Sequence, residues 1–537
     1  MALDNTIFPT EDQIPEKYKP KVVEQRKYLI DGELREWKGD MQEITSPVCV
    51  RSADGSVKRM RLGSTPLHTG AEALSALEAA VTAYNGGRGE WPSASVGTRV
   101  RYMEKFVAEM LKAREPTIKL LALEIGKTEK DATTEFDRTV EYINATIKAV
   151  KELDMNSARI HEEGGVLAMI KRAPLGTVLC MGPYNYPLNE TYTTLIPALI
   201  MGNTVVFKPA KYGVLLHQPL LDAYNVFPKG VVNTVYGDGR VIVTPMMQTG
   251  KFDALAFIGS CSVANDIMRN HPKLNRLKPI LGLGAKNPSI ILEDGDLEVA
   301  VKEGVLGALS YNGQRCTALK THFVPRKLAG EYVARLSEAV DKLVIGMPWT
   351  PNVGITPLPE DGYPQKMDAF VQDALAKGAK IANPKGGQIN ETIYSPAVIY
   401  PVNDTMDLYW KEQFGPVIPV VPYDDIEEVL AYAPRIGLGQ QASIFTRDAA
   451  KLGRTLDVLS KQFCRINLNC QCQRGPDSLP FSGRGDSAVG TLDVEAALRA
   501  FSIRTLYATK DNPVNREITR KVLADDSSQF LSTDYYI

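Results

Sequence analysis

The sequence has almost no net charge and no long apolar segment, and both absences exclude classes of function. Its 62 Lys and Arg residues nearly balance 63 Asp and Glu residues, so no general positive field is present to hold a polyanion, and we expect no nucleic-acid partner. No run approaches the roughly 20 apolar residues that span a bilayer. The first residues also lack a basic segment followed by an apolar one. We therefore expect a cytoplasmic protein that does not bind membranes.

Histidine and cysteine are scarce, which argues against a metal centre. Five His and seven Cys residues form no metal-ligand spacing and no dense disulfide framework. Cys470 and Cys472 have the spacing that places two side chains on one face of a strand, where thiols usually pack as small apolar groups. Metal binding by this pair is the less favoured alternative, so we expect no metal site.

The length and the apolar pattern predict an α/β protein of several domains. A chain of 537 residues exceeds what one hydrophobic core supports, so we expect two or three domains. Residues 1–60 are polar and are predicted to be irregular, and apolar residues at helical spacing predict helices over 73–84 and 100–111. Residues 155–173 predict a hairpin that turns at Gly164 and Gly165.

From Gly176 onward, short β-rich runs alternate with helical patterns, which is typical of βαβ units on a parallel sheet. A second α/β region follows at about 289–470. The candidate strands of the two regions are TVLCM, TVVFK, VNTVY, ALAFI, SIIL, THFV, AVIY, VIPVV, QASIF and CRINL.

Cys316 is the candidate nucleophile. It lies between a helical pattern over 299–309 and a predicted strand, and therefore in a loop. Loops held by a rigid scaffold often carry nucleophiles, and a thiol reacts as its thiolate when positive charge or backbone donors are near. From these residues alone, the alternative is a small buried side chain without a chemical role.

Six motifs, taken together in order and spacing, resemble signatures of the aldehyde dehydrogenase superfamily. They are MGPYNYPLNE (181–190), VVFKPA (205–210), AFIGS (256–260), GQRCTA (313–318), EQFGPV (412–417) and PFSGRGDS (480–487). The resemblance implies an α/β fold with a Rossmann-type coenzyme domain, an α/β catalytic domain, and a small β oligomerisation arm with a C-terminal tail. The expected boundaries are 1–154 with 174–282, then 283–492, then 155–173 with 493–537. The arm implies a homo-oligomer, a dimer or tetramer, with the tail packed on a neighbouring subunit.

The resemblance also assigns roles to single residues. Cys316 attacks the aldehyde carbonyl, and Asn185 holds the oxyanion of the thiohemiacetal together with the Cys316 backbone N–H. Oxidation then leaves a thioester on Cys316. A nicotinamide cofactor is implied, and the residues that bind it are Met181, Tyr184, Lys208, Lys211, Gly259, Ser260, Leu283, Glu412 and Phe414.

Lys211 favours NADP over NAD. Family members that prefer NAD often carry a glutamate three residues after the ribose-binding lysine, here Lys208, where it repels a 2'-phosphate. The positive charge of Lys211 could instead pair with that phosphate. The alternative is a solvated loop residue without a role.

Within the superfamily, the chain is most similar to non-phosphorylating, NADP-dependent glyceraldehyde-3-phosphate dehydrogenases. Four residues match positions at which those enzymes bind the substrate phosphate: Arg138, Tyr186, Arg315 and Arg474. Planar guanidinium groups suit phosphate oxygens. The resemblance therefore implies oxidation of glyceraldehyde 3-phosphate to 3-phosphoglycerate, although each arginine alone is more typical of a surface ion pair.

The sequence departs from the family at Gly282. Members usually have Glu-Leu-Gly-Gly-Lys, and here the stretch from Gly282 to Lys286 reads Gly-Leu-Gly-Ala-Lys. That glutamate is the base that activates water against the thioester, a role worth about 10² to 10⁴-fold. Three alternatives stay open: hydrolysis through another carboxylate or a positioned water, transfer of the acyl group to coenzyme A or phosphate, and an impaired enzyme. The last includes a nucleotide-binding relative without activity.

Overall fold

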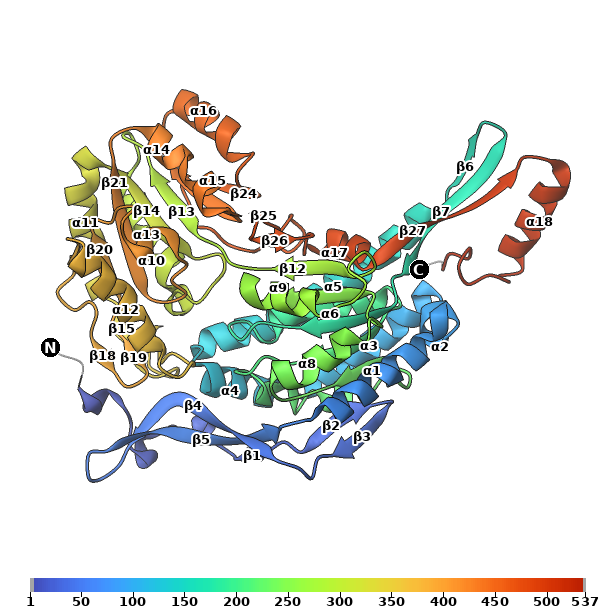
Figure 1. The fold of residues 1–537 in the computed structure, drawn as a ribbon, viewed down its shortest axis with the longest axis horizontal. Helices are drawn as coiled ribbons and strands as arrows, with labels where there is room; N and C mark the ends of the chain where they lie inside the picture. The colour runs from blue at the N-terminus through green and yellow to red at the C-terminus, as the bar shows by residue number, and fades with distance from the viewer. Residues whose placement is uncertain (1–3, 535–537) are drawn as a thin grey trace.

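The computed structural model describes residues 4–534, and its two largest sheets are mainly parallel (Figure 1). The first sheet has the strand order β10-β9-β8-β11-β12-β26. Its strands are β8 (Thr177–Met181), β9 (Thr204–Lys208), β10 (Val232–Thr234), β11 (Ala254–Ile258), β12 (Lys278–Gly282) and β26 (Ala488–Val489). Strand β26 runs antiparallel to β12, and the other neighbours run parallel. The central strands are buried along their length, which is why they read as continuous apolar runs.

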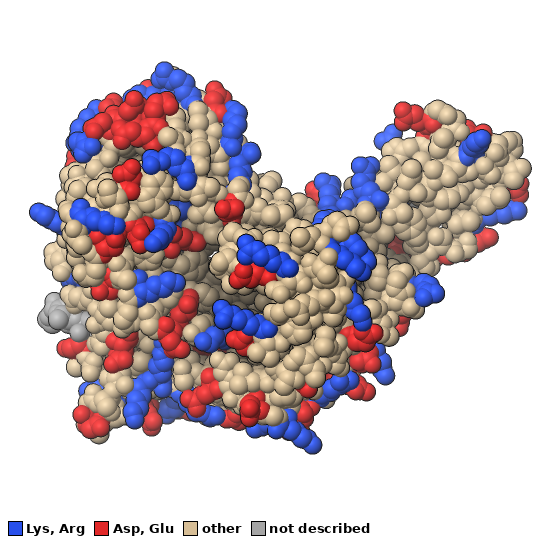
Figure 2. Space-filling view, viewed as in Figure 1, with Lys and Arg blue, Asp and Glu red and all other residues tan. Residues whose placement is uncertain are grey.

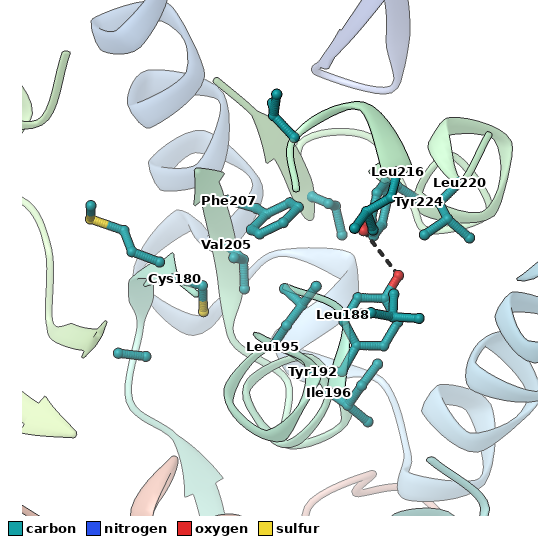
Figure 3. Packing of buried hydrophobic residues seen from close by; sticks show 14 of the residues in the cluster. Cys180, Leu188, Tyr192, Leu195, Ile196, Val205, Phe207, Leu216, Leu220 and Tyr224 are labelled. Atoms are coloured by element: carbon teal, nitrogen blue, oxygen red, sulfur yellow. Dashed lines mark hydrogen bonds between the residues drawn. The ribbon is translucent and has the colours of Figure 1, made fainter. Parts of the chain in front are cut away.

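Helices surround this sheet, and α1 and α6 contact its strands directly. The helices of this region include α1 (Gly70–Tyr84), α3 (Val96–Lys112), α4 (Arg114–Ile125), α5 (Glu129–Ser157), α6 (Asn189–Ile200), α7 (Leu221–Tyr224), α8 (Gly239–Gln248) and α9 (Cys261–Arg269). Figure 3 shows apolar side chains of β8, β9 and α6 packed around Tyr192, whose hydroxyl lies 2.9 Å from that of Tyr224. Buried hydroxyls need such partners. The helices predicted over 73–84 and 100–111 are confirmed within α1 and α3.

The order of the strands reverses between β8 and β11. Strands β9 and β10 extend the sheet on one side of β8, whereas β11 and β12 extend it on the other. Met181 ends β8 and pairs with Phe257, one residue before the end of β11. Parallel sheets open a crevice beyond the carboxyl ends of their strands at such a switch point, and ligands bind there.

The second sheet has the order β17-β20-β21-β14-β13-β23-β24. Its strands are β13 (Asn287–Ile291), β14 (Leu319–Pro325), β17 (Lys380–Ile381), β20 (Ala397–Tyr400), β21 (Val417–Tyr423), β23 (Gln441–Phe445) and β24 (Arg465–Leu468). Helices of the same region include α10 (Leu297–Leu309), α11 (Arg326–Asp341), α12 (Tyr363–Ala376) and α16 (Ala449–Leu459). Each candidate strand named from the sequence is confirmed, with ends that differ by up to two residues, and so is the α/β fold class. The domain boundaries stay a prediction.

The N-terminal region forms strands, so the prediction that residues 1–60 are irregular is wrong. The strands are β1 (Val23–Glu24), β2 (Lys27–Ile30), β3 (Glu33–Glu36), β4 (Met41–Arg51) and β5 (Val57–Pro66). Strands β4 and β5 pair antiparallel, with register shifts between Ile44 and Cys49. Such irregularities interrupt the alternation of apolar and polar residues by which a strand is recognised in a sequence.

A three-stranded arm projects from the body (Figure 1). It consists of β6 (Ile160–Glu163), β7 (Val166–Pro174) and β27 (Ser502–Lys510) in the order β27-β7-β6. The predicted hairpin is confirmed: Gly164 and Gly165 have φ of 57° and 75° at its turn, but residues 155–157 belong to α5. The role of the arm in joining subunits stays a prediction.

The C-terminal tail contacts its own chain. After α17 (Val494–Ala500) and β27, helix α18 (Pro513–Ala524) lies along the arm, with the Thr519 hydroxyl 2.7 Å from that of Tyr507. The buried ammonium of Lys171 lies 3.1 Å from Asp154 and also donates to the Ser532 carbonyl. Residues 531–533 supply acceptors for the buried charge of Lys171. Packing of the tail on a neighbouring subunit stays a prediction.

Charges of both signs alternate over the surface seen in Figure 2, as the balanced composition predicts. Among residues 4–534, no helix is long and apolar enough to cross a membrane. Over the same range, no group of three or more His, Cys, Asp or Glu side chains is arranged to hold a metal ion.

Candidate active site

Cys316 lies in a strained loop between α10 and β14. The three residues Tyr311, Asn312 and Gly313 have φ of 50°, 56° and 73°, a conformation that tyrosine and asparagine rarely adopt. The Asn312 side chain accepts the Thr356 backbone N–H at 2.9 Å and donates to the Thr356 carbonyl at 3.0 Å. These contacts stabilise the loop in a backbone conformation that its residues disfavour, and they thereby fix the position of Cys316.

Asn185 lies beside this loop. Its side chain is buried, and Nδ2 donates to the Gln314 carbonyl at 2.8 Å. On the other flank, Asn287 Nδ2 donates to the Cys316 carbonyl at 2.7 Å. Within the described chain, the Cys316 backbone N–H donates to no other backbone group. Because the Asn185 amide carries a second N–H, two donors can converge on an oxygen at Cys316.

A cavity of about 560 Å³ connects Cys316 with the switch point. Small-molecule sites commonly have volumes of about 300 to 1,000 Å³. The cavity brings together the predicted residues Met181, Tyr184, Asn185, Lys211, Gly259, Ser260, Leu283, Cys316, Glu412 and Phe414. The predicted residues outside its lining are Arg138, Tyr186, Lys208, Arg315 and Arg474.

The residues at the crevice suit a phosphate-bearing cofactor. Ser260 is the N-cap of α9, and its hydroxyl accepts the Val263 N–H at 3.4 Å. A Cβ at Gly259 would lie 2.4 Å from the tip of the Phe257 ring, so a larger residue there would force this ring to move. Lys208 ends β9, where burial lowers the pKa of its ammonium to about 8 and the charge of Asp238 opposes the shift.

Further charges border the same cavity. Glu412 Oε1 lies 2.7 Å from Lys320 Nζ, and this ammonium lies 4.4 Å from the centre of the Phe414 ring. Lys211 is exposed at the cavity, 5.2 Å from the centre of the Tyr212 ring. A bound anion would therefore meet an exposed cation at Lys211.

Two of the predicted phosphate-binding arginines are paired with carboxylates. Arg474 donates from Nη1 to Glu190 at 2.6 Å, from Nε to Asp477 at 3.2 Å and from Nη2 to the Leu492 carbonyl at 3.0 Å. Arg138 donates to both Asp477 oxygens, at 2.7 and 3.1 Å. All three guanidinium nitrogens of Arg474 are thus engaged, and only the second N–H of each Nη is left for another acceptor.

Arg315 and Tyr186 have other partners. Arg315 Nη2 donates to the carbonyls of Leu306 and Gly307, at 3.2 and 2.8 Å, while its Nε is buried and lacks a partner in the described structure. The Tyr186 ring faces Lys127, whose ammonium lies 3.4 Å from the ring centre. Because a buried N–H without a partner is rare, Arg315 is a candidate for binding an acceptor that the protein does not supply.

The electrostatic surroundings keep the Cys316 thiol protonated. Burial raises the pKa of Cys316 to about 11, and the Glu190 carboxylate adds to this rise, whereas Arg474 and Lys320 oppose it. At neutral pH, the reactive thiolate is therefore the minor form in this structure.

The profile of the aldehyde dehydrogenase family matches residues 53–505. This chain belongs to that family. The predictions of the family and of an oxidoreductase are confirmed.

Relatives of this aldehyde dehydrogenase include NADP-dependent glyceraldehyde-3-phosphate dehydrogenases. That of Streptococcus equinus is 34% identical over 427 residues, which are 77% of this chain and 86% of the relative. That of Nicotiana plumbaginifolia is 29% identical over 416 residues, 75% of this chain and 81% of the relative. The crystal structure of the enzyme from Bacillus halodurans C-125, complexed with NADP, is 29% identical and has a TM-score of 0.80 over 90% of this chain and 99% of that chain.

Gly282 ends β12 and lines the cavity of this aldehyde dehydrogenase. A Cβ built there would lie 3.3 Å from Ile258 Cγ1 and 3.8 Å from Leu492 Cδ1. The backbone conformation of Gly282 is open to any residue, and a side chain could be placed with a small shift of Ile258. Nothing in the backbone therefore requires glycine at this position.

The sequence interpretation missed Glu190 and Asp477, the carboxylates that bind Arg474. Glu190 is the last residue of the MGPYNYPLNE motif and is the charged residue of a helix whose residues are all buried. A carboxylate at such a place is unusual enough to have marked it. Asp477 follows Arg474 by three residues, a spacing that could have suggested the pair.

Proposed function

We propose that this aldehyde dehydrogenase oxidises glyceraldehyde 3-phosphate to 3-phosphoglycerate with NADP, without adding a second phosphate group to the product. The observation that carries the proposal is the position of Cys316. It lines the cavity at the switch point, and the positive charge of Arg474 opposes the rise that burial causes in the pKa of its thiol. The relatives from Streptococcus equinus and Nicotiana plumbaginifolia are named for NADP-dependent oxidation of this substrate and support the proposal.

The chemistry begins when Cys316 Sγ attacks the aldehyde carbon and negative charge develops on the carbonyl oxygen. The Asn185 amide and the Cys316 backbone N–H would donate to that oxygen, and one such donor is worth about 10² to 10³-fold in kcat. The bound nicotinamide supplies the electron acceptor for oxidation of the thiohemiacetal to a thioester. Water then attacks the thioester carbon, the C–S bond breaks, and the acid is released as the Cys316 thiol is regenerated.

The residues at the switch point fit NADP. Gly259 lets a ligand approach the N-terminus of α9, which attracts phosphate groups through its N–H donors and dipole. Lys208 at the end of β9, two residues before the cavity-lining Ala210, would bond the adenosine ribose, and the exposed Lys211 would meet a 2'-phosphate. Met181, Tyr184, Leu283, Glu412 and Phe414 would surround the nicotinamide half.

The substrate phosphate would bind in the arginine cluster. Arg138 and Arg474 pair with two carboxylates, Asp477 and Glu190, whereas Arg315 donates to backbone carbonyls and has no carboxylate partner among the described ion pairs. The unpartnered Nε of Arg315 and the partly exposed Arg138 offer the first contacts to a phosphate. Guanidinium groups bind phosphate oxygens in paired hydrogen bonds.

Stopped-flow measurement of NADPH formation tests this function. With glyceraldehyde 3-phosphate and NADP, we expect a burst of about one NADPH per active site, followed by a slower steady rate, because acylation precedes a deacylation that lacks the family glutamate. No NADPH from this substrate, with NADPH formed from an unphosphorylated aldehyde such as glyceraldehyde, would contradict the assignment of substrate.

The same measurement with coenzyme A tests a second candidate function. Gly282 removes the carboxylate that would activate water, so a thioester on Cys316 could be passed to a thiol instead. A steady rate that rises severalfold on adding coenzyme A, with acyl-coenzyme A as the product, would show that the acyl group passes to coenzyme A rather than to water. An unchanged rate and free 3-phosphoglycerate as product are the results we expect.

The Lys211→Glu variant tests the choice of cofactor. Loss of a charged contact to the 2'-phosphate is expected to raise the KM for NADP about 10-fold to 100-fold. The KM for NAD should change by less than about threefold, because NAD lacks that phosphate. Lys461→Glu makes the same charge change outside the cavity lining and serves as the control. Equal changes for both cofactors would exclude a contact between Lys211 and the 2'-phosphate.

A further inference from the structure

The cavity of Cys316 contains a carboxylate for which neither the family resemblance nor the proposed function gives a role. Three acidic residues line this cavity: Glu190, Glu360 and Glu412. Glu412 is bound to Lys320, and one of its oxygens lies 3.1 Å from where a Cβ of Gly284 would stand. Glu360 lies beside Tyr184 and Tyr363, where burial raises the pKa of both hydroxyls and the charge of Glu360 adds to the rise. Glu190 remains as the carboxylate beside the nucleophile.

The fold places Glu190 in the helix that follows the oxyanion residue. It lies in the first turn of α6, five residues after Asn185, and its side chain is 9% exposed. Arg474 Nη1 holds Oε2 of this carboxylate at 2.6 Å and is itself fixed by Asp477 and by the Leu492 carbonyl. This fixed partner orients the carboxylate at the cavity.

The charges that affect the pKa of the Cys316 thiol also indicate that Glu190 lies near it, in agreement with the cavity lining. Among the charges that most affect the Cys316 thiol, Glu190 is the acidic one. Burial raises the pKa of Glu190 itself, although Arg474 and Arg138 oppose the rise. A carboxylate with a raised pKa is a stronger base, and the best general base titrates near the working pH.

We propose that Glu190 is the general base of deacylation, in place of the carboxylate absent at Gly282. The proposal rests on the proposed function, because it concerns hydrolysis of the thioester formed there. Water oxygen bonds to the thioester carbon while its proton passes to the Glu190 carboxylate. The C–S bond breaks, Cys316 leaves as thiolate and takes up the proton from Glu190, and the carboxylic acid departs. No oxidant is consumed in this step.

The Glu190→Gln variant tests this role. Glutamine keeps the side-chain shape and an oxygen for Arg474 but removes the base. We expect the NADPH burst to stay at about one per site while the steady rate falls about 100-fold or more. In the wild type, the steady rate should fall as pH falls through the pKa of Glu190, and this acidic limb should be absent from the variant. A burst and a steady rate that fall together would overturn the proposal, as would an unchanged steady rate.

Substitutions at Gly282 in the Glu190→Gln background supply the matched controls. Gly282→Glu restores the family carboxylate in a place where a side chain fits, and it is expected to recover the steady rate at least 10-fold. Gly282→Gln has the same size without a base and should recover nothing. Equal effects of the two substitutions would overturn the proposal, because hydrolysis would then not be limited by a missing base.

Alkylation of Cys316 provides a readout that does not depend on the substrate. Removing the Glu190 charge should lower the pKa of Cys316, so the pH profile of its reaction with iodoacetamide should shift to lower pH in Glu190→Gln. An unshifted profile would mean that the carboxylate is not beside the thiol. If the wild type oxidises only an unphosphorylated aldehyde, the proposed substrate fails, and the Glu190 comparison is made with that aldehyde.

Discussion

Replacing Cys316 with alanine is expected to abolish NADPH formation, lowering kcat by at least about 10⁴-fold, as expected for the loss of a covalent nucleophile. The burst and the steady rate should vanish together, because no thiohemiacetal can form. The fold should persist, since Cys316 is half-buried and its loop is held by Asn287 and by the Asn312–Thr356 pair. Stopped-flow absorbance for NADPH, combined with thermal unfolding, separates loss of chemistry from loss of structure.

The pH dependence of Cys316 alkylation belongs to the same prediction. With a pKa of about 11, the fraction of thiolate should rise about tenfold for each pH unit between pH 7 and 10. Peptide mass analysis after iodoacetamide labelling follows this residue separately from the exposed Cys464. The Cys464→Ala variant is the control and should retain full activity. NADPH formation by Cys316→Ala near the wild-type rate would mean that another group is the nucleophile.

Replacing Glu135 with alanine is expected to lower the free energy of unfolding by about 3 to 5 kcal/mol, the largest stability effect that we predict. Glu135 and Lys127 form an ion pair in which neither side chain is exposed. Glu135 Oε1 also accepts the backbone N–H groups of Leu188 and Asn189, each at 3.1 Å, at the start of α6. Its loss leaves a buried ammonium and two backbone donors without a partner.

Urea unfolding monitored by fluorescence and circular dichroism measures this effect. Glu338→Gln removes one partner of an exposed i,i+4 pair and should change the free energy of unfolding by less than about 1 kcal/mol. The double variant Lys127→Met, Glu135→Leu removes both charges and should be less destabilised than Glu135→Ala, because no lone buried charge remains. A loss below about 1 kcal/mol for Glu135→Ala would show that water or another group replaces the carboxylate.

The sheets could be predicted from the sequence because their strands are short and buried. TVLCM and TVVFK are apolar runs bounded by glycine and by turn residues, and tertiary packing leaves these local signals unchanged. Strands β4 and β5 failed to show such a signal because their register shifts break the alternation along each strand.

The candidate site was predictable only where residues lie within a motif. Cys316, Asn185 and the cavity residues were named from motifs, and the structure gathers most of them at one cavity. The contact of Arg474 with Glu190 was not predictable, because the two residues lie 284 positions apart and only folding brings them together. The same holds for Glu135, which supports α6 from a distant helix: its contact to Leu188 spans 53 positions.

The pairing of β26 with β12 also has a consequence for synthesis on the ribosome. Leu281 and Gly282 of β12 find their edge partners in Val489 and Ala488, which are made about 200 residues later. At roughly 5 to 20 residues per second, the nascent coenzyme-side sheet keeps an open edge for about 10 to 40 seconds. An unpaired edge invites pairing with other chains, so the newly made first half of this protein is the part that needs shielding by a chaperone.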